Sequence, residues 1–316
     1  FETLEETREH VIVRTGFEAV IRKNFADPMP AFLTFDTDSL EKMAAFRFDD
    51  PWDDRRYFSP GDNQLAGMGD GFTRNSPGWI ETVRTLHSDI PVYGSVCEAQ
   101  EMLWRTIGLE NALLWMGLYP DEVGRFIERI GEFVVGIAKA QIRASGGLLD
   151  GLVIWGDVAY RNGLFFSPGY WRKHFKPVVK ALVDEGHAHG LPVIYHGCGN
   201  VQQIFADFIE IGVDAYNPLE AKAGLDVVAL RRQHGHKIAF CGNMDVLTWA
   251  QGSEEELRRV VLTKLNAAKG GGFIFQSDHS VPGTVSARSY EYVVNLVREY
   301  GRYPLRLGDY DLPDLK

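Results

Sequence analysis

The feature that most constrains the fold is a regular alternation of short apolar runs and longer amphipathic segments from about residue 120 onward. The apolar runs cover residues 148–157, 191–196, 213–218, 237–242 and 272–277, and helical spacing of apolar residues follows each of them. Runs that are apolar throughout are typical of strands in a parallel sheet that is covered on both faces. Each intervening segment is long enough for a helical crossover, so the sequence predicts five strand–helix units.

Two further apolar runs, residues 91–96 and 30–36, lie in the less regular first 120 residues. Counting them gives seven or eight strands, which favours a barrel over an open doubly wound sheet. Neither a GxGxxG nor a P-loop motif follows any predicted strand, as an open nucleotide-binding sheet would require. We therefore predict an α/β fold, a single (β/α)8 TIM barrel domain over residues 1–316, with an irregular N-terminal segment over about 1–85.

Charge and cysteine usage restrict the class of protein. The net charge is −10, which disfavours a general nucleic-acid surface because such surfaces are basic. The three cysteines are widely spaced, which argues for a reducing compartment rather than a disulfide framework. No apolar run reaches the roughly 18 residues of a membrane span, and the polar start is unlike a signal peptide. We expect a cytoplasmic protein with no nucleic-acid or membrane partner.

Polar and thiol side chains follow every strand of the regular region, at the point where the strand ends. In a barrel of parallel strands, ligand sites collect at these carboxyl ends, so we predict one functional site at this rim. The residues concerned are Asp157, His196, Cys198, Asn217, Glu220, Cys241, Asn243, Asp245, Gln276, Asp278 and His279.

His196 and Cys198 have the residue types of a zinc site. Alternate residues of an extended segment point the same way, and imidazole and thiolate are usual zinc ligands. A catalytic zinc needs only three protein ligands, and His279 is the best third candidate because its loop could lean over the barrel mouth. Cys241 is either a further ligand or a buried apolar thiol. Glu220 could be a ligand, a hydrogen-bonding partner of His196 or a substrate contact.

Asp157 is the other candidate for chemistry. A carboxylate at a strand end beside aromatic residues suits substrate polarisation or proton transfer, although it could equally cap a helix or turn. We expect Asp157 and Glu220 to be catalytic. The predicted substrate contacts are Trp155, Tyr160, Asn217 and Gln276. The aromatic residues near the site are typical either of an aromatic or apolar ligand or of an ordinary core and rim, since 12% of the chain is aromatic.

Several ordered motifs resemble those of one enzyme superfamily. The stretch from Asp157 through SPGYW, then HGCGN, GVDAYNPLE, FCGNMD and GGFIFQSDHS, resembles the uroporphyrinogen decarboxylase superfamily over roughly residues 85–305. The resemblance is closer to its corrinoid-dependent methyltransferase branch, and implies a (β/α)8 barrel with the active site in its mouth. Coenzyme M methyltransferases of that branch have a His-x-Cys zinc motif, here His196 and Cys198, and a later cysteine. The position of that cysteine corresponds to His279, which departs from the thiol-methylating pattern.

The resemblance implies a zinc-dependent methyltransferase. It would move a methyl group between a small substrate and the cobalt of a corrinoid (methylcobalamin) that a partner protein carries. The substrate would be a methoxylated aromatic or similar methyl donor, or a thiol. One alternative is a metal-free decarboxylase with Asp157 and His279 as acid–base groups, although the R-Q-A-G-R segment of true decarboxylases has no counterpart here. A second alternative is a non-enzymatic barrel that binds a small methylated or aromatic compound.

Overall fold

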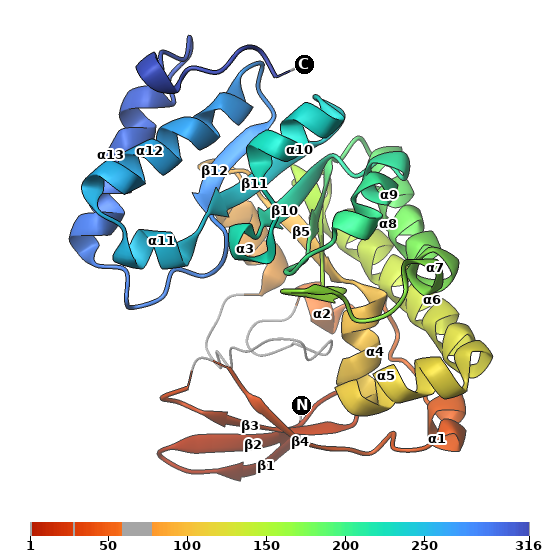
Figure 1. The fold of residues 1–316 in the computed structure, drawn as a ribbon. Helices are drawn as coiled ribbons and strands as arrows, with labels where there is room; N and C mark the ends of the chain where they lie inside the picture. Colours follow the sequence, from red (N-terminus) through yellow and green to blue (C-terminus); the bar gives the residue numbers. More distant parts are fainter. Residues whose placement is uncertain (1, 28, 59–77, 316) are drawn as a thin grey trace. The chain divides into compact units, whose positions relative to one another are not determined.

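The fold is described from a computed structural model that covers residues 2–27, 29–58 and 78–315 (Figure 1). The chain divides into two compact units. Unit 1 comprises Phe1–Trp155 and Gly169–Pro192, and unit 2 comprises Gly156–Pro168 and Val193–Lys316. None of the helices in the described ranges is both long and apolar enough to cross a membrane.

Unit 1 begins with a four-stranded antiparallel sheet in the order β1-β2-β3-β4. Its strands are β1 (Glu2–Glu6), β2 (His10–Arg14), β3 (Ala19–Asn24) and β4 (Ala31–Phe35). The prediction of an irregular start therefore needs correction, and the run at 30–36 is not a barrel strand but pairs antiparallel with β3. The physical reason is a two-residue alternation: Val11, Val13 and Ile21 form one buried face, against which Phe32 packs.

Unit 1 also contains two parallel strands, β5 (Tyr93–Cys97) and β6 (Gly151–Trp155), which pair directly with each other. The long helix α6 (Pro120–Ser145) lies between them in sequence and packs against β5. Its Gln141 side chain bonds both backbone groups of Ser95 on β5, which fixes the helix on the strand. The other helices of this unit are α1 (Leu40–Ala45), α2 (Arg55–Phe58), α3 (Trp79–Leu86), α4 (Ala99–Ile107), α5 (Leu109–Leu118), α7 (Pro168–Tyr170, with Pro168 in unit 2) and α8 (Lys176–Ala188).

Unit 2 contains four parallel strands that pair in sequence order. They are β9 (Val193–His196), β10 (Ala215–Leu219), β11 (Ala239–Met244) and β12 (Phe273–Ser277). The helices are α9 (Phe205–Glu210), α10 (Val227–His234), α11 (Val246–Gln251), α12 (Glu254–Leu265) and α13 (Ala287–Tyr300), and a short hairpin joins β7 (Ala159–Tyr160) to β8 (Gly163–Leu164). All five strands predicted after residue 120 are present, since β6 is the first of them.

The core of unit 2 lies where α12 and α13 pack on each other and α12 packs on β11. The predicted capping box is present, because the Ser253 side chain accepts the backbone N–H of Glu256 at the start of α12. Leu257, Val261 and Leu296 are among the residues buried in this core. Because the strands are parallel, the segments that leave β9, β10, β11 and β12 all emerge at the same edge of this sheet.

Candidate metal centre

The segment after β9 turns sharply against the β7–β8 hairpin. Gly199 has φ +90°, and a Cβ at this position would lie 2.6 Å from the carbonyl carbon of Ala159. The next residue, Asn200, donates its backbone N–H to the carbonyl oxygen of Tyr160 at 2.9 Å. Only glycine combines this backbone conformation with so close an approach, so the sequence Gly-Cys-Gly holds Cys198 beside the hairpin.

Two carboxylates hold this segment through consecutive backbone N–H groups. Asp157 Oδ1 accepts the N–H of Cys198 at 2.7 Å, and Glu220 Oε2 accepts the N–H of Gly199 at 2.5 Å. Glu220 is buried, and its other oxygen lies 3.1 Å from Nζ of Lys222. Hydrogen bonds to charged acceptors are stronger than neutral ones, so the backbone on both sides of the Cys198 carbonyl group is held firmly.

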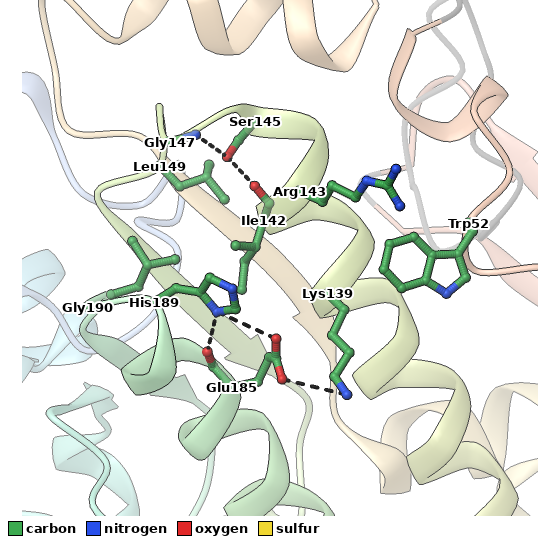
Figure 2. A pocket seen from close by; sticks show the side chains of 11 residues that line it. Trp52, Lys139, Ile142, Arg143, Ser145, Gly147, Leu149, Glu185, His189 and Gly190 are labelled. Carbon is green, nitrogen blue, oxygen red and sulfur yellow. Dashed lines mark hydrogen bonds and ion pairs between the residues drawn. The ribbon is translucent and has the colours of Figure 1, made fainter.

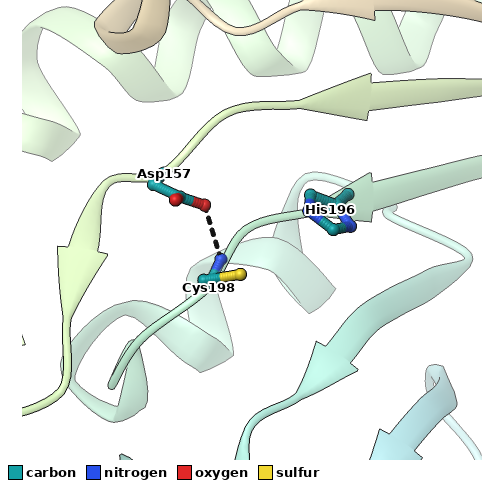
Figure 3. A group of neighbouring side chains, drawn as sticks. All are labelled: Asp157, His196 and Cys198. Carbon is teal, nitrogen blue, oxygen red and sulfur yellow. Dashed lines mark hydrogen bonds between the residues drawn. The ribbon is translucent and has the colours of Figure 1, made fainter. Parts of the chain in front are cut away.

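Asp157, His196 and Cys198 come together as a candidate metal centre (Figure 3). One potential ligand atom from each residue lies within 4.8 Å of the other two, and all three residues are half-buried. In the described part of the chain this is the one such group of three or more His, Cys, Asp or Glu donors. A carboxylate, an imidazole and a thiol form a donor set that suits zinc.

The imidazole of His196 has a partner on the neighbouring strand. Its Nδ1 lies 2.6 Å from Oδ1 of Asn217, and the side chain of Asn217 also bonds the thiol of Cys241. Because the amide oxygen can only accept, Nδ1 is the donor in this bond, which in the neutral imidazole leaves the lone pair on Nε2. This is the arrangement in which a metal-binding histidine is usually held.

The electrostatic surroundings of Cys198 favour a cation. Burial, together with the carboxylates of Asp157 and Glu220, raises the pKa of its thiol to about 12, and Lys222 opposes them. Without a positive charge the thiol therefore stays protonated at neutral pH. A bound divalent cation would supply that charge and favour the thiolate.

The remaining predicted site residues lie in different surroundings. His279 is exposed, and neither it nor Glu220 belongs to the group of three. Gln276 lies on β12 opposite Asn243 of β11, and Cys241 is buried. Trp155 ends β6 in unit 1, where the guanidinium of Arg105 lies 5.7 Å from its ring. The ring of Tyr160 is 49% exposed and stacks on Phe165 within the hairpin, 5.7 Å between centroids.

Two polar residues from the strand ends have structural partners. Asn243, which is fully buried, accepts the N–H of Val227 with Oδ1 and donates Nδ2 to the carbonyl oxygens of Leu219 and Leu225. Asp278 Oδ1 accepts the N–H of Val246 at 3.0 Å. These bonds tie the loops of unit 2 together and leave both residues outside the candidate metal centre.

Unit 1 contains a separate cavity of about 760 Å³ near the ends of α6 and α8 (Figure 2). Glu185 pairs there with Lys139 at 3.8 Å and with His189 at 3.5 Å, and the guanidinium of Arg143 lies 5.7 Å from the ring of Trp52. The cavity lies where the chain leads into β6 and β9, at the amino ends of those strands. Residues at that end of a (β/α)8 fold usually serve stability rather than chemistry.

Comparison with known proteins identifies the relatives of this chain. The model of a family described as "Uroporphyrinogen decarboxylase (URO-D)" matches residues 77–300. The uroporphyrinogen decarboxylase of Actinobacillus pleuropneumoniae serotype 5b is 28% identical over 185 residues, which cover 58% of this chain and 50% of that protein. That of Cellvibrio japonicus is 30% identical over 168 residues, covering 51% and 44%. The chain spans about half the length of the curated relatives it matches.

Among solved structures, the chain is similar to a methyltransferase from Methanosarcina mazei. The TM-score is 0.61 at 15% sequence identity, and the alignment covers 91% of this chain and 77% of that one. The likeness confirms the predicted α/β fold of the (β/α)8 barrel type. Because the family model covers most of the sequence, the chain belongs to the uroporphyrinogen decarboxylase (URO-D) family.

Proposed function

We propose that this protein is a zinc-dependent methyltransferase that moves a methyl group between a small substrate and the cobalt of a corrinoid carried by a partner protein. The observation that carries the proposal is the convergence of Asp157, His196 and Cys198 within 4.8 Å. The fold shared with the methyltransferase from Methanosarcina mazei supports it. In this proposal Asp157 is the third protein ligand, in place of His279, because its carboxylate lies beside the other two donors.

When bound, zinc would supply Lewis acidity, which eases departure of an ether or alcohol oxygen or stabilises a substrate thiolate. The residues of the chain prepare the site for this. Asn217 accepts the N–H of His196 Nδ1, which would leave Nε2 of the neutral imidazole available to a metal. Asp157 and Glu220 hold the backbone at Cys198 and Gly199, which keeps the segment that carries the thiol beside the other two donors.

The β7–β8 hairpin provides a wall for an aromatic substrate. Tyr160 of this hairpin is half exposed, and its ring stacks on Phe165. Its backbone carbonyl oxygen accepts the N–H of Asn200, which follows the candidate ligands His196 and Cys198 in the chain. An aromatic ring that stacked on Tyr160 would gain about 0.5–1.5 kcal/mol beyond its buried area. We therefore favour a methoxylated aromatic over a small thiol as the methyl-bearing substrate.

The test is methyl transfer from guaiacol or a related methoxylated aromatic to a reduced corrinoid, and from methylcobalamin to small thiols. We expect activity that a chelator abolishes, that added zinc restores, and that Cys198→Ala lowers at least about 100-fold. A chelator-resistant activity that Cys198→Ala leaves intact would refute the proposal.

The names of the curated relatives support a second function, decarboxylation without a metal, with Asp157 as an acid–base group. This function predicts turnover without any corrinoid and the same rate before and after chelation. The same preparation therefore distinguishes the two functions when it is assayed with and without chelator.

A further inference from the structure

A second concentration of polar atoms lies in unit 1, directly after β5. Glu98 caps α4, because its Oε2 accepts the backbone N–H of Gln100 at 2.5 Å. Both side chains are fully buried, with 0% exposure. Glu98 Oε1, Gln100 Oε1 and Gln100 Nε2 are buried with no hydrogen-bond partner among the described residues.

Buried polar side chains in folded proteins are nearly always paired, so three unpaired atoms on two neighbouring side chains require an explanation. The same unit provides a contrast. Gln141 is also buried, at 7% exposure, but its Oε1 accepts the N–H of Ser95 and its Nε2 donates to the Ser95 carbonyl oxygen. The amide of Gln141 therefore holds α6 on β5, whereas the amide of Gln100 holds nothing in the described structure.

The position of these atoms points to a ligand. They follow the carboxyl end of a parallel strand, which is where folds of this type bind small molecules. The neighbouring acid Glu101 is not part of the unpaired set, because it forms an ion pair with Arg105 at 2.8 Å. Native proteins keep unsatisfied polar groups chiefly where function requires them.

The unpaired donors and acceptors of Glu98 and Gln100 indicate which chemical group a ligand must present. Burial raises the pKa of Glu98 to about 8, so the side chain is protonated at neutral pH. Because Oε2 accepts the N–H of Gln100, the proton lies on Oε1 and makes it a donor. Gln100 adds an acceptor and a donor of its own. The matching group is uncharged, and both accepts and donates hydrogen bonds, as an amide or a hydroxyl does.

We propose that Glu98 and Gln100 form a binding site for an uncharged group of a small molecule that both donates and accepts hydrogen bonds. None of its residues belongs to the candidate metal centre, and the observations that support it do not depend on the proposed methyl transfer. Acetamide is the probe, because it is small and carries both a carbonyl oxygen and N–H donors. A probe of this size is expected to bind in about the millimolar range.

The first experiment compares the melting temperatures of Gln100→Met and Gln141→Met. Methionine matches glutamine in volume but has no polar amide, so Gln100→Met removes unpaired atoms and Gln141→Met removes paired ones. We expect Gln100→Met to raise Tm by about 2–6 °C and Gln141→Met to lower it by a similar amount. A fall in Tm for Gln100→Met would overturn the proposal, since it would show that the amide serves the fold.

The second experiment measures acetamide binding by saturation-transfer NMR. We expect binding to wild-type protein, at least a tenfold loss in Gln100→Met and in Glu98→Leu, and affinity within about threefold of wild type in Gln141→Met. Glu98→Gln should also bind within about threefold, because its amide accepts the N–H of Gln100 with one atom and donates with the other. No binding to wild type, or equal binding to Gln100→Met, would overturn the proposal.

Discussion

The hydrogen bond between Asn217 and His196 offers a specific test of how the candidate metal centre is held. Replacing Asn217 with leucine keeps the volume but leaves Nδ1 of His196 without its acceptor, which lies 2.6 Å away in the native protein. A half-buried hydrogen bond of this kind has a net value of about 0.5–1.5 kcal/mol. The imidazole would also be free to move its proton between Nδ1 and Nε2, whereas the bond to Asn217 keeps it on Nδ1.

Together these losses predict a 10- to 100-fold fall in zinc affinity, or about 1.4–2.7 kcal/mol. Competition against a chromophoric chelator at pH 7 measures it. Asn200→Ala is the matched control, because this asparagine accepts the N–H of Gln202 in the same segment and bonds neither His196 nor Cys198. Unchanged affinity in Asn217→Leu, or an equal loss in Asn200→Ala, would show that Asn217 does not position the histidine.

Three further predictions concern stability. Glu220→Gln removes the charge that pairs with Lys222 but keeps an acceptor for the N–H of Gly199. The free energy of unfolding in urea should fall by about 1–3 kcal/mol, and no change would mean that the buried ion pair does not stabilise the fold. Gly199→Ala should lower the free energy of unfolding by at least about 2 kcal/mol more than Gly147→Ala. Both glycines have φ near +90°, but only at Gly199 would the new Cβ meet backbone atoms. Equal losses of stability would contradict the close approach of Gly199 to Ala159. The pKa of Glu98 is about 8 in the folded state, against an ordinary value of 4.5 in the unfolded chain. The folded state therefore binds this proton more tightly, and the free energy of unfolding should fall as pH rises from about 5 to 8. The contribution is at most about 1.4 kcal/mol per pH unit, and a slope that persists in Glu98→Gln would assign it to another group.

The regular half of the fold could be predicted from sequence because its buried strands are continuous apolar runs and its helices have apolar residues at helical spacing. The apolar runs before His196 and Asn217 are buried strands, and the segments between them have the helical period. The fold of the N-terminal region is harder to predict. The run at 30–36 has the composition of a strand, but its sequence does not indicate which strand it pairs with. Antiparallel pairing of β4 with β3 depends on contacts that a single segment does not display.

The candidate metal centre could be predicted in part. The two-residue spacing of His196 and Cys198 was sufficient to predict that their side chains lie close together, because both belong to one short extended segment. The third position was harder to predict, since sequence order does not reveal distances between side chains on different strands. The sequence predicts a catalytic Asp157, and its carboxylate also lies within 4.8 Å of the potential ligand atoms of His196 and Cys198. Cys241 is a further candidate ligand by sequence; its thiol bonds the side chain of Asn217 and lies outside the group of three donors.

The unpaired atoms of Glu98 and Gln100 left no recognisable signal in the sequence. A Glu-Ala-Gln stretch after an apolar run is typical of an ordinary helix start, with glutamate as the cap. Only the burial of both side chains, together with the missing partners, distinguishes this segment from such a cap.

The zinc content of purified protein shows whether Asp157, His196 and Cys198 bind the metal. It is measured by metal analysis of wild type, Asp157→Ala and His279→Ala after dialysis against a weak chelator. We predict about one zinc per chain in wild type and in His279→Ala, and at least a tenfold loss of zinc in Asp157→Ala. Zinc that is absent from wild type, or that is retained by Asp157→Ala and lost from His279→Ala, would contradict a centre built from Asp157, His196 and Cys198.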